Sequence, residues 1–317
     1  MEYSQRILVY RLSALGDVAI LQPVVIQRAK ECPNVLFLVA GPGLLAPLFE
    51  GVDNIQYIPI KKQSSIKLYK QLSAYKPTMM ADMHFVLRSI GLDWLFRLHG
   101  IPVKSIRKKG GENKPVWKRY DQVLDRCKLP KSNVLENTAS KYWDVRPAKG
   151  EAIIGIAPYS QQIGKIWQKD YMQELIRLLS SFDHYKIVLF GDKKESEELN
   201  SWAEKYNNVK SIAGTLPFNE ELKVISSLNV MVSMDSANMH FASCVGTPVI
   251  SLWGATHPKN GFYGWRQDPA WAIQSNLPCR PCSKFGKKPC RYNSYPCFSA
   301  ITPQDVLSEI QKILGEK

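Results

Sequence analysis

Residues Val230–Gly254, with the sequence VMVSMDSANMHFASCVGTPVISLWG, contain the pattern that decides the fold. The apolar run Val230–Met234 predicts a buried strand, and Ala237–Val245 predicts a short helix that ends at Gly246. Val249–Trp253 follows as a second buried strand, because its β-branched and aromatic residues suit a parallel sheet. The stretch is therefore predicted to form a compact βαβ unit.

Polar residues gather where the first of these strands meets the helix. Asp235 and Ser236 stand at the strand end, and Ala237 opens the helix. His240 comes four residues after Ser236, so the two lie on one helix face. Because free amides at a helix N-terminus attract anions, this corner predicts a phosphate or diphosphate site. The alternative is that Asp235 or Ser236 only caps the helix and that His240 only packs in the core.

Length and composition restrict the class of protein. The chain has 317 residues, enough for two domains, and its hydrophobic (45%) and charged (22%) fractions are ordinary for a soluble globular protein. No apolar run approaches the ~20 residues that span a membrane. A strand pattern begins within MEYSQRILVY and leaves no room for a signal peptide, which predicts a cytoplasmic protein. The net charge of +14 predicts an acidic partner: nucleic acid, an anionic membrane surface or phosphorylated small molecules.

The rest of the chain alternates strand and helix patterns in two series. The first series starts with a strand at Arg6–Arg11, and Asp17 then opens a helical segment in which Pro23 favours a position near the helix start. The second series starts at Ala152–Ile156, after a linker at Pro147–Gly150. Two such series imply an α/β fold of two Rossmann-like parallel-sheet domains with ligands at the carboxyl ends of the strands. The cleft between the domains is the expected active site.

Three motifs carry a resemblance to a known family: RLSALGD (Arg11–Asp17), the triplet Lys165-Ile166-Trp167, and DSANMHFASCVGTPVISLWGATHP (Asp235–Pro258). Together they resemble the ADP-heptose:lipopolysaccharide heptosyltransferases of glycosyltransferase family 9, which are inverting enzymes of the GT-B fold. The resemblance implies an acceptor-binding domain over 1–147 and a nucleotide-sugar-binding domain over 148–317. It also implies transfer of heptose from ADP-heptose to the lipopolysaccharide inner core without a catalytic cofactor. At Ala237 the chain departs from the glycine that the family often has.

The resemblance assigns two catalytic roles. Asp17 matches the aspartate that acts as general base on the acceptor hydroxyl while that oxygen attacks the anomeric carbon. Its alternative is an acid at a helix start, stabilised by the helix dipole. Lys165 matches a lysine that neutralises the donor diphosphate and the leaving ADP, and its alternative is a solvated surface lysine.

The remaining implied roles concern donor binding. Ser160 lies in the Lys165 loop and offers a hydroxyl to phosphate, and Glu195 resembles an acid that hydrogen-bonds the nucleotide ribose. An exposed glutamate in a first helical turn is the alternative for Glu195. The full donor-binding set is Ser160, Lys165, Glu195, Asp235, Ser236, Ala237 and His240.

The stretch Lys104–Arg119 contains seven Lys and Arg residues, among them Arg107, Lys108 and Lys109, the candidates for contact with an anionic acceptor. A solvated loop is the alternative. The positive charge fits an anionic donor and an anionic lipopolysaccharide-core acceptor, so the enzyme is expected at the inner membrane face as a peripheral protein. A transferase for another nucleotide sugar or acceptor stays open. A nucleic-acid-binding module has the charge but no zinc-finger, RNP or helix–turn–helix pattern in its favour.

Four of the seven cysteines cluster near the C-terminus. Cys279, Cys282, Cys290 and Cys297 give the spacing C-x₂-C-x₇-C-x₆-C. Four thiolates at such a spacing are able to hold a structural zinc ion, but only the first pair has the spacing of a common zinc site. A cytosolic compartment argues against disulfides. Reduced thiols that pack in the fold are therefore the default expectation, with structural zinc as the alternative.

Overall fold

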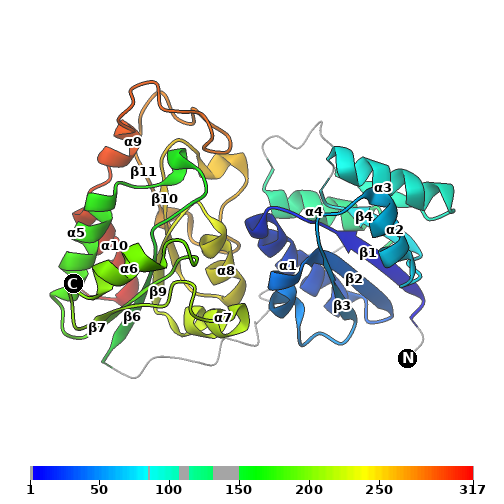
Figure 1. The fold of residues 1–317 in the computed structure, drawn as a ribbon, viewed down its shortest axis with the longest axis horizontal. Helices are drawn as coiled ribbons and strands as arrows, with labels where there is room; N and C mark the ends of the chain where they lie inside the picture. Colours follow the sequence, from blue (N-terminus) through cyan, green and yellow to red (C-terminus); the bar gives the residue numbers. More distant parts are fainter. Residues whose placement is uncertain (1–2, 85, 107–113, 131–149, 317) are drawn as a thin grey trace. The chain divides into compact units, whose positions relative to one another are not determined.

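A computed structural model describes residues 3–316 except residue 85 and the segments 107–113 and 131–149. The chain divides into two compact units, Met1–Thr138 and Ala139–Lys317, and each is built on its own parallel sheet (Figure 1). The predicted domain boundary at residue 147 falls within 131–149, outside the described residues, and stays a prediction. Two parallel-sheet α/β units were expected, and this fold class is confirmed.

The N-terminal unit contains a five-stranded parallel sheet in the order β3-β2-β1-β4-β5. Its strands are β1 (Gln5–Tyr10), β2 (Val35–Pro42), β3 (Ile55–Ile60), β4 (Met79–Asp82) and β5 (Val103–Ser105). Its helices are α1 (Leu15–Glu31), the 3₁₀ helix η1 (Gly43–Phe49), α2 (Ser65–Ser73), α3 (Leu87–Leu98) and α4 (Val116–Asp125). Helices α2 and α3 pack their buried leucines and Phe96 into one core with β1, β2 and β3. Helix α1 packs against α4, where buried Arg28 donates to Asp121 at 2.6 and 2.8 Å.

Helix α1 corrects one expectation from the sequence. It begins at Leu15, so Pro23 lies in the middle of the helix and not near its start. A proline inside a helix costs ~3 kcal/mol because a backbone hydrogen bond is lost. The neighbouring side chains Leu21, Val24 and Val25 are all fully buried. Each contributes ~1.5–3 kcal/mol on burial, so core packing outweighs the proline.

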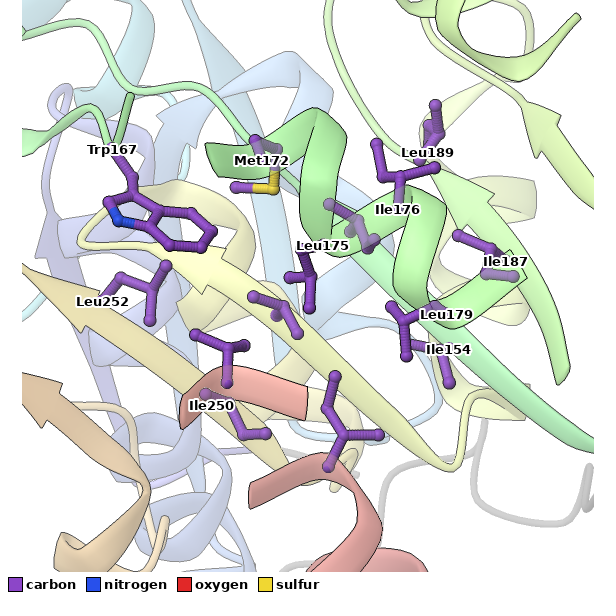
Figure 2. Packing of buried hydrophobic residues seen from close by; sticks show 14 of the residues in the cluster. Ile154, Trp167, Met172, Leu175, Ile176, Leu179, Ile187, Leu189, Ile250 and Leu252 are labelled. Atoms are coloured by element: carbon purple, nitrogen blue, oxygen red, sulfur yellow. The ribbon is translucent and has the colours of Figure 1, made fainter. Parts of the chain in front are cut away.

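The C-terminal unit contains a six-stranded parallel sheet in the order β11-β10-β9-β6-β7-β8. Its strands are β6 (Ala152–Ala157), β7 (Tyr185–Leu189), β8 (Val209–Ser211), β9 (Val230–Met234), β10 (Val249–Trp253) and β11 (Ala272–Gln274). Its α-helices are α5 (Lys169–Ser180), α6 (Ser196–Ala203), α7 (Phe218–Ser227), α8 (Ala237–Val245), α9 (Pro296–Ser299) and α10 (Pro303–Leu314). Three 3₁₀ helices complete it: η2 (Ile163–Lys165), η3 (Pro258–Asn260) and η4 (Pro269–Trp271). One face of this sheet is covered by the apolar side of α5, with Met172, Leu175 and Leu179 over Ile154 and Ile187 (Figure 2).

Within Val230–Gly254, the two strands and the helix have the bounds that the sequence predicted. Strand β9, helix α8 and strand β10 form a parallel βαβ unit, and Gly246 ends α8 with a left-handed backbone (φ 83°). Strand β9 pairs with β6, while β6 also pairs with β7. The chain therefore builds the sheet outward from β6 in one direction and then resumes on its other side at β9. Such a switch point between β6 and β9 is where parallel α/β sheets bind ligands.

Within the described ranges, no helix combines the length and the apolar character that crossing a bilayer requires.

Candidate active site

Three loops at the carboxyl ends of β6, β9 and β10 meet on the carboxylate of Asp235. The Lys165 ammonium lies 2.9 Å from Asp235 Oδ2, and the Thr256 hydroxyl donates to the same oxygen at 2.8 Å. The Ser160 hydroxyl donates to the backbone carbonyl of Asp235 at 3.4 Å. The structure thus brings Ser160, Lys165 and Asp235 together as a group at the switch point, and it adds Thr256.

The charges in this group are held out of bulk water. Asp235 is buried, and Lys165 is mostly buried. A buried carboxylate requires a partner, and here an ammonium and a hydroxyl satisfy it. An ammonium has three N–H donors, so Lys165 is able to bond Asp235 and an anionic ligand together. The group therefore holds the Lys165 ammonium in a fixed position with limited solvent screening.

The N-terminus of α8 adjoins Asp235 and supplies backbone donors. Ser236 occupies the N-cap position, but among the described residues its hydroxyl pairs with Ser233 Oγ (3.2 Å) and forms no capping bond. Ala237 is the first helical residue, so the amides of this turn point out of the helix end, where they are able to bind an anion. His240 is buried one turn further on, and its role in donor binding stays a prediction beside the packing alternative.

Core packing fixes the Lys165 loop. Trp167, two residues later, is fully buried, and its indole nitrogen lies 3.2 Å from the carbonyls of Phe298 and Ile301. Figure 2 shows its ring against Leu252 in the core of the C-terminal unit. The buried tryptophan of the triplet thus anchors the backbone on which the lysine stands.

A distant loop also holds Lys165. The Gly164 amide donates to the Gly286 carbonyl at 3.2 Å, and a Cβ on Gly164 would stand only 2.8 Å from that oxygen. Gly286 has a φ of 75°, and a Cβ there would stand 2.7 Å from Lys165 Cγ. Only glycine allows this close approach and this backbone. Sequence reasoning missed Gly286 because nothing local marks the contact, and it missed Thr256 although that residue lies inside the quoted Asp235–Pro258 motif.

Glu195 lies in the loop after β7, the next strand of the sheet. Its carboxylate accepts a hydrogen bond from the Asp192 amide at 2.8 Å, and it occupies the N-cap position of α6. Burial raises the pKa of the Glu195 carboxyl above its ordinary value. Glu195 is thus half-buried, whereas the alternative described an exposed glutamate. Contact with a ribose stays a prediction.

In the N-terminal unit Asp17 forms a second charged group. Its Oδ2 lies 2.7 Å from the Arg11 guanidinium and accepts from the Ala14 amide at 3.1 Å. The Arg11 guanidinium also stands over the Tyr120 ring, 5.5 Å from its centre. Burial raises the pKa of the Tyr120 hydroxyl, and the charge of Asp17 adds to that effect. Asp17 is thus both an acid of the first helical turn, as the alternative held, and a carboxylate in a fixed orientation.

His84 joins the loop before α1. The Leu12 amide donates to His84 Nδ1 at 3.3 Å, and Ser13 Oγ lies 3.3 Å from His84 Nε2. Because Nδ1 accepts a hydrogen bond from an amide, a neutral ring at this position carries its proton on Nε2. The imidazole therefore braces the RLSALGD loop that carries Asp17.

The acceptor candidates Arg107, Lys108 and Lys109 lie outside the described residues, so their role stays a prediction.

The cysteine cluster is not arranged as a metal site. No group of three or more His, Cys, Asp or Glu among the described residues is placed to hold a metal ion, and all four cysteines are described. Cys297 is buried, which raises the pKa of its thiol, while Cys282 is exposed and donates weakly to the Ala255 carbonyl at 3.8 Å. The zinc alternative gains no support from the structure.

Comparison with solved structures defines the fold. The Escherichia coli ADP-heptose lps heptosyltransferase II matches with a TM-score of 0.73 at 19% identity and covers 98% of both chains. A family 9 glycosyl transferase from Veillonella parvula matches with a TM-score of 0.77 at 18% identity, over 100% of this chain and 99% of the other. These likenesses show the GT-B fold of two parallel-sheet α/β units.

Sequence comparisons extend this to the family. The profile "Glycosyltransferase family 9 (heptosyltransferase)" matches residues 79–294. Lipooligosaccharide heptosyltransferase 2 of Campylobacter jejuni is 24% identical over 97% of this chain and 99% of its own length. Lipopolysaccharide heptosyltransferase 1 of Pseudomonas aeruginosa is 22% identical over 98% of each. The chain belongs to glycosyltransferase family 9, the heptosyltransferase family, and the resemblance of its three motifs is confirmed.

Proposed function

We propose that this protein transfers a heptose from ADP-heptose to the lipopolysaccharide inner core with inversion at the anomeric carbon. The observation that carries the proposal is the Lys165–Asp235–Thr256 group beside the N-terminus of α8. A fixed ammonium and a set of helix amides suit a diphosphate. The names of the curated relatives and of the solved heptosyltransferases support heptose as the sugar and lipopolysaccharide as the acceptor.

In this proposal the residues have separate roles in donor binding, proton transfer and acceptor binding. Lys165 and the first-turn amides of α8 bind the diphosphate and stabilise the negative charge that develops on the leaving ADP. Asp17 takes the proton from the acceptor hydroxyl, and its ion pair with Arg11 holds the carboxylate in one orientation. Glu195 bonds the ribose, and Arg107, Lys108 and Lys109 attract the phosphorylated acceptor. The reaction takes place at the cytoplasmic face of the inner membrane, where a peripheral enzyme meets a lipid-anchored acceptor.

A nucleotide-sugar panel tests the proposal. Purified protein is incubated with ADP-heptose, ADP-glucose or UDP-glucose together with an inner-core acceptor that lacks heptose. We expect nucleotide release and a mass increase of one heptose with the first donor alone. Equal turnover of another nucleotide sugar would establish the related-transferase alternative. Tight ADP binding without any turnover would indicate a nucleotide-binding protein and refute the proposed reaction.

A further inference from the structure

Helix α3 carries large apolar side chains on its solvent face. Leu87 is 90% exposed, Trp94 63% and Leu98 73%. Spacings of seven and four residues place these three on one side of a helix, and we call them the α3 stripe. The opposite side packs Leu92 and Phe96 into the core. The solvent-facing side of a surface helix is ordinarily polar. Because α3 has large apolar side chains on its solvent-facing side as well as on its core-facing side, that solvent-facing side indicates a binding surface for a partner.

Helix α2 extends the apolar surface. It lies beside α3 in the N-terminal unit (Figure 1), and a Cβ on Gly91 of α3 would stand 2.9 Å from Ser65 Oγ of α2. The rings of Tyr69 and Phe96 also meet edge to face, 5.0 Å between centres. Ile66, the neighbour of Ser65, is 61% exposed. The two helices thus pack together, and both carry exposed apolar side chains: the α3 stripe and Ile66.

The charges around this surface have one sign. Residues 54–106 contain eight Lys and Arg but only two acids, Asp82 and Asp93. Both acids are buried, at 0% and 5% exposure, so they contribute little negative charge to the surface. The exposed bases on and beside the two helices include Lys61, Lys62, Lys67, Lys70 and Arg97. Lys70 lies one turn after Ile66 on the same side of α2. Apolar side chains inside a basic rim are the combination that an anionic lipid surface complements.

We propose that the α3 stripe and Ile66 dock this protein on the surface of an anionic phospholipid bilayer. Helix α3 has 12 residues and is about 18 Å long, whereas a bilayer core is about 30 Å thick. It therefore lies in the interface, where tryptophan and leucine enter the headgroup–acyl boundary and the bases face lipid phosphates. A second copy of the chain is a poorer partner, because self-association would bring two basic rims together.

This inference rests on the proposed function for its setting, since the acceptor there is anchored in a bilayer. The apolar and charge arguments for docking rest on the exposed residues of α2 and α3 alone. The docking assay contains neither donor nor acceptor, so it separates the two. Vesicle binding by a protein without heptosyltransferase activity would leave the docking surface standing and remove the proposed reaction. Transfer to a lipid-free acceptor by a protein that ignores vesicles would do the reverse.

The test is sedimentation of the full chain with vesicles of phosphatidylcholine containing roughly 30% phosphatidylglycerol. The variant Leu87→Gln/Trp94→Gln/Leu98→Gln removes the α3 stripe, and we expect its vesicle affinity to fall by about ten-fold or more. The matched control, Leu44→Gln/Leu216→Gln, removes two leucines that are 52% and 37% exposed on other elements, and it should bind as the wild type does. Pure phosphatidylcholine vesicles, or about 0.5 M NaCl, should weaken wild-type binding because the basic rim then has less attraction.

Three results would overturn the proposal. The first is wild-type protein that stays in solution with anionic vesicles. The second is a stripe variant that binds as tightly as wild type, or a control that loses as much. The third is a wild-type dimer in vesicle-free buffer that the stripe variant abolishes, since a second copy would then cover the surface. Circular dichroism melting and ADP calorimetry on each variant confirm that the replaced residues, all exposed, leave the fold and the C-terminal unit intact.

Discussion

Replacement of Asp17 by asparagine separates catalysis from support of the fold. The change keeps the side-chain shape and an oxygen that accepts from the Ala14 amide, but it removes the carboxylate from Arg11. Both partners of that ion pair are mostly buried, with 12% and 18% of their side chains exposed. A hydrogen bond to a charged group contributes ~1.5–3 kcal/mol, so we expect about 2 kcal/mol of lost stability. For a unit of this size that corresponds to a fall in Tm of roughly 4–8 °C.

The effect on turnover should be larger and of a different kind. Loss of a general base lowers kcat by ~10²–10⁴, or about 3–5 kcal/mol of transition-state stabilisation. ADP affinity should stay at the wild-type value, because the Lys165–Asp235–Thr256 group that we propose to bind the donor belongs to the other unit.

The matched control is Arg11→Gln, which breaks the same ion pair but keeps the carboxylate. We expect it to lose a similar amount of stability, yet to lose about ten-fold or less in kcat because the proton acceptor remains. Turnover is followed by ADP release from ADP-heptose, and stability by calorimetric melting. If Asp17→Asn turns over within a few-fold of Arg11→Gln, Asp17 supports the fold and is not the base.

Three further changes test the donor group, a buried acid and the acceptor stretch. Lys165→Met should weaken ADP binding about ten-fold or more in calorimetry, since a charge-assisted contact to diphosphate is lost; unchanged affinity would make Lys165 only the partner of Asp235. Burial and the nearby charge of Asp82 raise the pKa of Asp93 from 3.8 to about 7. The folded protein then binds more protons than the unfolded chain between these values, so this carboxyl lowers stability as pH rises from about 4 to 7. Asp93→Asn should flatten that part of the pH–Tm curve and raise Tm at about pH 8; a curve of unchanged slope would contradict it. Serine at Arg107, Lys108 and Lys109 should raise the acceptor KM and reduce its salt dependence without changing ADP affinity, and an unaltered KM would identify a plain solvated loop.

The sequence by itself determined the fold class and the location of the polar corner at Asp235 and Ser236. The hydrophobic periodicity and the residue composition predicted the bounds of β9, α8 and β10. Buried parallel strands have continuous apolar sequences, and a glycine marks a left-handed helix end. The same local logic placed Asp235 and Ser236 at the helix start. The three motifs identified the family, which the comparison over residues 79–294 confirmed.

Only the tertiary structure decided how the charges are held. That Asp235 pairs with Lys165 and Thr256 follows from strand order, since β9 lies between β6 and β10 in the sheet although β6 is far from both in the chain. The contact of Gly286 with Lys165 joins two loops that share no local pattern. Pro23 sits in mid-helix because burial on the sheet outweighs backbone propensity. The α3 stripe likewise shows itself only when burial is known, because leucine and tryptophan at helical spacing predict a core-facing side until the fold assigns that side to Leu92 and Phe96. Local preference sets the elements, but partners distant in sequence are chosen by the packing of the whole unit.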